Sequence, residues 1–127
     1  MLATSYRVLS RADLWLEWTG EIPPELADVA GLIEQGRDAL NDAYLVAEKG
    51  AYQKARAAFA AALERCQDRS ALMWFLACEY AEKGYFADSA ALLGALLASG
   101  STRLDVQRLY AEMTWWRDQG RWLPWIH

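Results

Sequence analysis

Residues 47–50 read Ala-Glu-Lys-Gly, and residues 81–84 repeat the same four residues 34 positions later (84 − 50). An aromatic residue stands two positions after each glycine, Tyr52 in the first copy and Phe86 in the second. A sequence word that recurs at a period of roughly 20 to 50 residues is typical of proteins built from stacked repeats. Because glycine adopts positive φ readily, each copy predicts one helix that ends at the glycine and a second helix that runs back antiparallel to it.

The segment after each glycine carries an apolar stripe at helical spacing. In the first copy the stripe consists of Tyr52, Ala55, Phe59, Ala62, Leu63 and Cys66, and in the second of Phe86, Ser89, Ala90, Leu93, Leu96 and Leu97. A third helical segment follows over residues 104–119. The chain shows no sustained period-2 alternation and no Asn-Gly or Asp-Gly hairpin, so no strand is expected. The sequence therefore predicts an all-α fold of stacked antiparallel helical hairpins.

The N-terminal third is expected to be helical as well. Residues 4–19 are dense in apolar groups on more than one face, which predicts an N-terminal helix, 1–20, that is buried on two sides or packed against a partner. Pro23 and Pro24 stand where a second helix would begin, over residues 23–35. Gly31 and Gly36 weaken that pattern and predict a break or bend between about residues 33 and 37. The expected single domain, 1–127, thus comprises helices 1–20 and 23–35, repeats 36–69 and 70–103, and a degenerate third copy with a cap, 104–127.

Composition excludes several classes of partner. The formal net charge is −4 and no basic cluster is present, which argues against nucleic acid and against an anionic membrane surface. No apolar stretch reaches the roughly 18 residues of a membrane span, and the N-terminus lacks the apolar core of a signal peptide. Cys66 and Cys78 do not form a disulfide framework. These features predict a cytoplasmic protein with reduced thiols.

Residues 36–103 resemble two tetratricopeptide repeats, a family of 34-residue helix-turn-helix units. Slots of the family pattern are occupied at the same offset in both copies, by Ala43 and Ala77, Gly50 and Gly84, Tyr52 and Phe86, Ala55 and Ser89, and Phe59 and Leu93. The chain departs from the pattern where the family often has Trp, Leu and a closing Pro, with Ala39 and Met73, Asp42 in the first copy, and Gln67 and Ser101. The alternative is an ordinary helical bundle in which the repeated word is coincidental.

The resemblance implies a short right-handed superhelix whose concave groove is lined by the first helix of each repeat. The corresponding residues of this chain are Arg37, Leu40, Asn41, Tyr44, Ala71, Trp74, Phe75, Cys78 and Arg108. Their aromatic, apolar and sulfur surfaces favour an apolar peptide or helix over the acidic C-termini that some members clamp. The alternative is that the chain's own residues 4–19 cover Tyr44 and Trp74.

A tryptophan-rich C-terminal segment provides a second candidate surface. It contains Trp115, Trp116, Trp122 and Trp125, and it either caps the open end of the repeats or forms an interface with a partner. No catalytic set is found, since the single histidine is His127 and the two cysteines form no CxxC motif. We expect no enzyme activity, no cofactor and no metal.

The predicted function is non-enzymatic binding of another protein. Among small members of the family, the chain looks most like bacterial secretion chaperones and co-chaperones, which shield an apolar segment of an export substrate. The alternative is a structural subunit that assembles through its apolar ends, with itself as a homo-oligomer or with a fixed partner.

Overall fold

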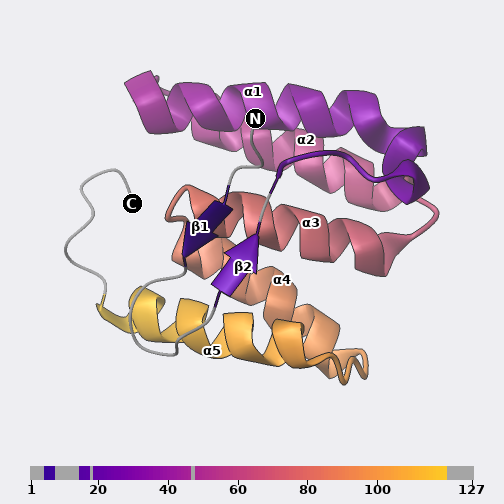
Figure 1. Cartoon of the computed structure of the whole chain (residues 1–127). Coiled ribbons are helices and arrows are strands. Elements are labelled where there is room, and N and C mark those ends of the chain that lie inside the picture. Colours follow the sequence, from indigo (N-terminus) through magenta and orange to yellow (C-terminus); the bar gives the residue numbers. More distant parts are fainter. Residues whose placement is uncertain (1–4, 8–14, 18, 47, 120–127) are drawn as a thin grey trace. The chain divides into compact units, whose positions relative to one another are not determined.

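The computed structural model describes residues 5–7, 15–17, 19–46 and 48–119. The elements in chain order are β1 (Ser5–Arg7), β2 (Trp15–Glu17), the 3-10 helix η1 (Pro24–Val29), α1 (Ala30–Val46), α2 (Ala51–Arg65), α3 (Arg69–Glu82), α4 (Phe86–Ala98) and α5 (Leu104–Gln119) (Figure 1). The five α-helices confirm the predicted helical character of the main body of the chain.

The chain divides into two compact units, each described by itself. The hairpin unit, Ile22–Leu72, contains η1, α1, α2 and the first turn of α3. The split unit consists of Met1–Glu21 together with Met73–His127, and contains the strand pair, most of α3, α4 and α5.

The hairpin unit begins at the two prolines, as expected, but η1 leads directly into α1. Of the break or bend predicted between about residues 33 and 37, the break does not occur, because α1 runs unbroken from Ala30 to Val46 through both of its glycines. Gly36 is buried in the seam with α2, where a Cβ would lie only 2.5 Å from Cε1 of Phe59. The glycine therefore makes room for the Phe59 ring, and the packing gained there outweighs its weak helix propensity.

The hairpin turns back at Gly50, whose φ of 85° confirms the predicted positive-φ turn. Helices α1 and α2 pack along their length, and the residues of α2 that face the interior are Ala51, Ala55, Ala58, Phe59 and Ala62. After α2, the backbone N–H of Gln67 donates to Oδ2 of Asp28, 3.0 Å away, which ties the chain back to η1. Oδ1 of Asp68 accepts the N–H of Ala71 at 3.0 Å, as expected for the N-cap of α3.

In the split unit, α3 ends in a Schellman turn centred on Gly84, which has a φ of 81°. The N–H of Tyr85 donates to the carbonyl of Tyr80 (2.9 Å) and the N–H of Gly84 to that of Ala81 (3.1 Å). The rings of Tyr80 and Tyr85 meet edge to face, which supplies the apolar contact that accompanies this turn. Two orphan carbonyls of α3 are satisfied in this way, as the repeated glycine predicted.

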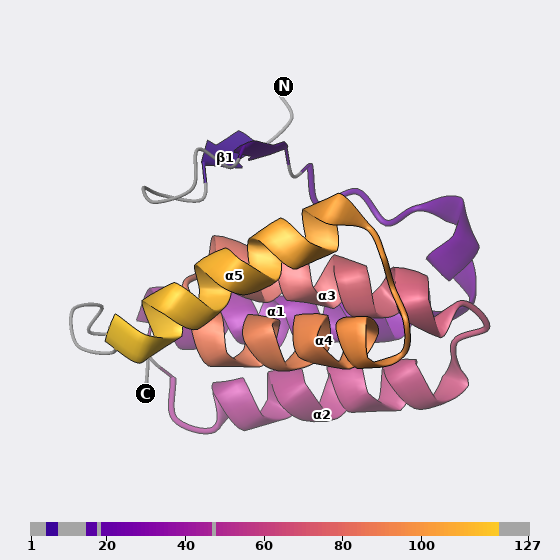
Figure 2. The ribbon, with the colours of Figure 1, turned by 90° about the horizontal axis from the view of Figure 1, so that it is seen from below.

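Helix α4 contacts both the helix before it, α3, and the helix after it, α5. The buried hydroxyl of Ser89 donates to the carbonyl of Ala77 at 2.8 Å, which fixes α4 on α3. A second Schellman turn at Gly100 ends α4, and α5 then lies beside α4 (Figure 2). Gly94 of α4 faces the ring of Tyr110, to which a Cβ would approach within 3.2 Å.

The strand pair replaces the expected N-terminal helix. β1 and β2 are antiparallel, with Tyr6 opposite Leu16. The prediction of a helix over residues 1–20 is therefore wrong at Ser5–Arg7 and Trp15–Glu17. The segment has no single apolar stripe, and its aromatic residues favour strands once a pairing partner is available.

The 34-residue period is visible in the burial of the second helices. Positions related by 34 in α2 and α4 are buried together, namely Ala55 and Ser89, Phe59 and Leu93, and Ala62 and Leu96. Tyr52 and Phe86 are both half-buried, as are Leu63 and Leu97. The first helices differ more, since Ala43 and Tyr44 are half-buried whereas Ala77 and Cys78 are buried. The 34-residue period therefore holds for the packing of α2 and α4 as well as for the repeated residues Ala-Glu-Lys-Gly.

Candidate protein-binding surfaces

A groove runs along the outside of the α1–α2 seam. It has a volume of about 630 Å³ and opens to solvent. Its lining residues are Leu32, Gln35, Ala39 and Asp42 from α1, and Lys54, Ala57, Ala58 and Ala61 from α2. The four α1 residues are spaced 3, 4 and 3 apart, which places them on one stripe beside the buried stripe of Ile33, Gly36 and Leu40. The contact between Gly36 and Phe59 holds the two helices close, so the seam forms the floor of the groove.

The groove is apolar along most of its length and charged at one end. Alanines form most of its α2 wall, so it has room for the larger side chains of another molecule. Asp42 lies near the end of α1 and Lys54 near the start of α2, so both charges lie toward the turn. Apolar lining with a few charged groups at one end allows a bound segment to be oriented as well as held.

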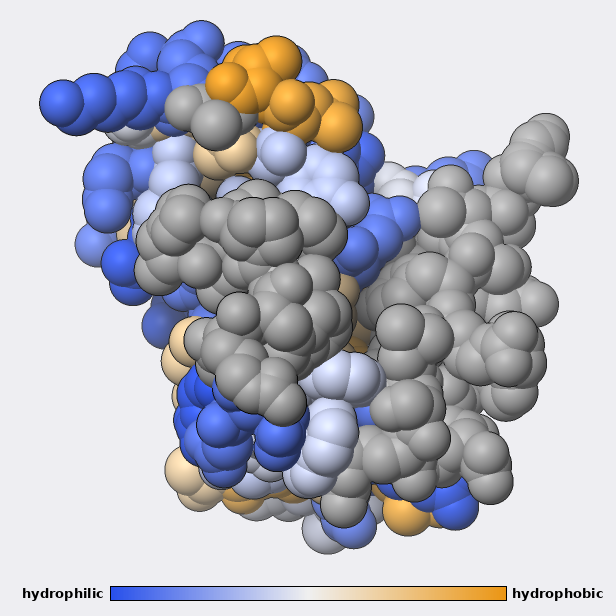
Figure 3. Space-filling model, turned by 90° about the vertical axis from the view of Figure 1, so that its left-hand side faces the viewer, coloured by the Kyte–Doolittle hydropathy of each residue, from blue (hydrophilic) through white to orange (hydrophobic). Residues whose placement is uncertain are grey.

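The stripe of α1 that lines the groove continues beyond it and ends in apolar residues. Val46, four residues after Asp42, is 65% exposed, and its neighbour Leu45 is 71% exposed. Figure 3 shows this end of α1 as an apolar patch among hydrophilic surface. Because exposed large aliphatic side chains in adjacent positions are uncommon on a solvated helix end, this patch extends the candidate surface of the hairpin unit.

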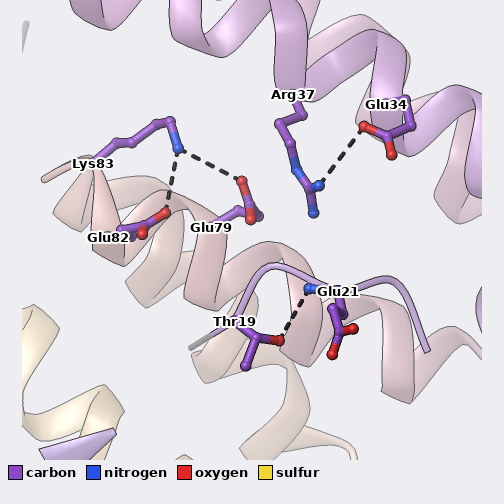
Figure 4. Close-up of polar contacts among 7 residues, drawn as sticks. All are labelled: Thr19, Glu21, Glu34, Arg37, Glu79, Glu82 and Lys83. Carbon is purple, nitrogen blue, oxygen red and sulfur yellow. Dashed lines mark hydrogen bonds and ion pairs between the residues drawn. The ribbon is translucent and has the colours of Figure 1, made fainter. Parts of the chain in front are cut away.

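The nine residues predicted for the concave groove are divided between the two units. Arg37, Leu40, Asn41, Tyr44 and Ala71 belong to the hairpin unit, and Trp74, Phe75, Cys78 and Arg108 to the split unit. Leu40, Phe75 and Cys78 are buried and offer little surface to a partner. Arg37, Asn41, Tyr44, Ala71 and Trp74 are half-buried, whereas Arg108 is exposed. Arg37 approaches Glu34 at 3.7 Å on the same helix (Figure 4).

Trp74 is engaged within its own unit. The guanidinium of Arg103 lies over its ring, 4.8 Å from the centroid. Arg103 is held in place by Asp105, with Nε 3.0 Å from Oδ1 and Nη2 2.6 Å from Oδ2. One face of the indole is thus covered by a cation whose orientation is fixed, so Trp74 serves at least to fasten the start of α5 to α3.

The tryptophans of α5 form an aromatic cluster with the start of α4. Trp116 stacks on Phe86 with centroids 5.9 Å apart, and Trp115 meets Trp116 edge to face at 4.6 Å. The indole N–H of Trp116 donates to Oε2 of Glu112, a buried carboxylate, at 2.8 Å. Trp122 and Trp125, the other two residues of this predicted surface, lie outside the described residues.

Charged groups near the turn of α3 are arranged around one lysine. Nζ of Lys83 lies 3.4 Å from Oε1 of Glu82 and 3.7 Å from Oε2 of the buried Glu79 (Figure 4). Glu82, one of the repeated residues, is half-buried and paired with Lys83. Lys83 thus compensates the buried carboxylate of Glu79 near the C-terminal end of α3.

Both cysteines are reduced and disfavour the thiolate. Burial raises the pKa of the Cys78 thiol well above its ordinary value, and the carboxylate of Asp105 adds to the effect. The pKa of Cys66 is also raised, by burial and then by the charge of Asp28. Neither environment activates a nucleophile, because a reactive cysteine needs a lowered pKa.

Within the described ranges, histidine, cysteine, aspartate and glutamate side chains nowhere gather in a group of three or more that could hold a metal ion. In the same part of the chain, no helix combines the length and the apolar character required to cross a membrane. Comparisons with protein-family models, with curated proteins and with solved structures yielded no match to this chain. The functional proposal therefore depends on the surfaces of the molecule itself.

Proposed function

We propose that this chain is a non-enzymatic protein-binding module that holds an apolar peptide or helix of a partner protein. The observation that carries the proposal is the open groove of about 630 Å³ between α1 and α2, with its alanine-rich wall. Its volume lies within the range of about 300 to 1,000 Å³ typical of binding pockets. The apolar patch of Leu45 and Val46 prolongs the same side of α1.

The groove suits a helix better than an extended strand. It follows two packed helices, and neither helix presents the unpaired backbone N–H and C=O groups with which a strand is bound at a sheet edge. A partner helix would place large apolar side chains at intervals of three and four residues against Leu32, Ala39 and Ala57. Asp42 and Lys54 would set its direction by pairing with charges at one of its ends.

The same proposal includes the wider architecture. The burial pattern shared by α2 and α4, together with the glycine turns, supports a short superhelix of the tetratricopeptide kind. In that setting the protein acts as a cytoplasmic bacterial chaperone or co-chaperone for an export substrate.

A second candidate is a structural subunit that assembles through its apolar ends. The exposure of Leu45 and Val46 favours it. Light scattering coupled to size exclusion separates the two candidates, because a module with an open groove is monomeric and a subunit is not. Replacing Val46 by Lys would dissociate an assembly built on this patch.

The groove itself is tested by filling it. Ala57→Trp places an indole in the groove, whereas Ala60→Trp places one on an exposed part of α2 that does not line it. Helical peptides selected from a display library on the wild-type protein should lose at least tenfold in affinity for Ala57→Trp and keep their affinity for Ala60→Trp. Selected peptides that bind both variants equally would show that the groove is not the binding site.

A further inference from the structure

Helix α5 repeats the burial pattern of α3. Positions related by 34 on the two helices are buried together, namely Leu72 and Val106, Phe75 and Leu109, Cys78 and Glu112, and Glu79 and Met113. Helix α3 begins at Arg69 and α5 at Leu104, within one residue of the same offset. In its starting position and its main buried face, α5 therefore corresponds to α3, the first helix of the preceding hairpin.

A second face of α3 is covered by α4, the second helix of its hairpin. Ala77, Tyr80 and Ala81 are buried on this face. The hydrogen bond from Ser89 to the carbonyl of Ala77 and the edge contact between Tyr80 and Tyr85 show that α4 and its turn are what covers it.

Among the described residues, no helix covers the same face of α5. Ala111, which stands 34 positions after Ala77, is exposed, and Thr114 and Trp115, the counterparts of Tyr80 and Ala81, are only half-buried. Leu104, on the same stripe as Ala111 and Trp115, is 58% exposed. The face thus has the small central residue and the flanking apolar groups of a helix contact, and none of the described helices covers it as α4 covers α3.

We propose that this face of α5 binds an amphipathic helix of a partner protein, in the position relative to α5 that α4 takes relative to α3. The chemistry of the occupant follows from the two second helices. Both place a small residue at the contact and bulky or apolar residues four and seven positions later, as Ser89, Leu93 and Leu96 do in α4 and Ala55, Phe59 and Ala62 do in α2.

The charge of α5 adds a second condition on the partner helix. Arg108 lies on the stripe between Leu104 and Ala111 and is exposed. A helix seated on this stripe would bring a residue of its flank close to that guanidinium, so the partner helix carries an acidic residue there. This surface is distinct from the α1–α2 groove, since all of its residues belong to the split unit.

The probe is a fluorescent 15-residue helical peptide with Ser, Leu and Leu at the spacing of Ser89, Leu93 and Leu96, and with glutamates flanking that face. Fluorescence anisotropy should show that it binds the full chain with a micromolar Kd. Ala111→Arg should weaken this binding at least tenfold, whereas Ala91→Arg, at an exposed alanine of α4, should leave it unchanged. Circular dichroism verifies that both variants are folded.

Charge exchange tests the assigned orientation. Arg108→Glu should weaken the glutamate-flanked peptide severalfold and strengthen a lysine-flanked version of it by a similar factor. Ala57→Trp, which fills the groove of the proposed function, should change neither affinity, so the two proposals succeed or fail separately.

Three results would overturn the proposal. The first is failure of the peptide to bind, or equal binding to Ala111→Arg and to wild type. The second is binding that occurs only after Trp122 and Trp125 are replaced by alanine, which would assign the face to the chain's own C-terminal segment. The third is a dimer in light scattering that Ala111→Arg dissociates, which would make a second copy the occupant.

Discussion

Replacing Gly36 by alanine tests the packing on which the α1–α2 groove depends. The added Cβ would lie 2.5 Å from Cε1, 2.6 Å from Cδ1 and 3.0 Å from Cζ of Phe59, well inside an ordinary carbon–carbon contact of about 3.5 Å. Phe59 is buried and has little room to move. The mutation gains about 1 kcal/mol in helix propensity. Overpacking costs about 1 to 3 kcal/mol, and with three ring atoms in contact we expect the upper part of that range.

The net expectation is a loss of about 1 to 2 kcal/mol in the free energy of unfolding, measured by urea denaturation followed by circular dichroism. Gly31→Ala is the matched control, because it lies on the same helix and a Cβ there would meet nothing within 4 Å. It should stabilise the protein by up to about 1 kcal/mol. Adding Phe59→Leu to Gly36→Ala should recover part of the loss, with a coupling energy of about 1 kcal/mol or more. If Gly36→Ala stabilised the protein as much as Gly31→Ala, the close contact would be refuted.

Four further outcomes are expected. Gly84→Val should lower the free energy of unfolding by about 1 to 3 kcal/mol, because a β-branched residue is strained at a φ of 81°; an unchanged melting temperature would contradict the turn. Ser89→Leu should cost more than about 2 kcal/mol in urea denaturation through overpacking and a lost hydrogen bond, and Ser89→Ala only about 1 kcal/mol; equal losses would argue against tight packing at Ser89. A double-mutant cycle of Trp74→Ala and Arg103→Ala should give a coupling energy of about 0.5 to 1 kcal/mol, and additive losses would argue against the stack. Because the folded Cys78 keeps its proton above the unfolded pKa of about 8.5, its contribution to stability is fully present below that pH and is lost above it. The free energy of unfolding of wild type, relative to that of Cys78→Ala, should therefore fall by about 1.4 kcal/mol per pH unit above about pH 9. A difference that stays constant with pH would contradict the raised pKa.

The turns could be predicted from the sequence because their cause is local. Gly50 and Gly84 adopt positive φ where the repeated word places them, and the stripes of α2 and α4 are buried as their spacing indicated. The role of Gly36 could not be predicted, because its cause is not local. Its role is decided by Phe59, 23 positions later, and no local pattern shows that a missing Cβ is needed there. The strand pair escaped prediction because three-residue strands carry no usable alternation and depend on pairing across an intervening segment.

The candidate surfaces likewise depend on contacts between residues far apart in the sequence. Helical spacing identified a stripe on each helix, but the α1–α2 groove is lined by two stripes brought together by the turn, and its alanines attract no notice in sequence. The stack of Arg103 on Trp74 likewise joins residues from different helix ends. Arg108 was predicted to line a concave groove, and the structure places it on the exposed stripe of α5. The chemistry of its partner follows from the burial of α3 and α5 and not from any local sequence pattern.

The division of the chain has a consequence for the order of folding. The hairpin unit is one continuous stretch, Ile22–Leu72, so its contacts close short loops and can form while the rest of the chain is still being synthesised. The split unit is interrupted by that stretch, and the segment Met1–Glu21 is made before the hairpin unit but belongs with helices that are made after it. The N-terminal segment must therefore wait until Met73 and the residues beyond it have left the ribosome. Closing so long a loop costs little extra free energy, since each doubling of loop length adds only about 0.6 kcal/mol, but it makes this segment the last to join.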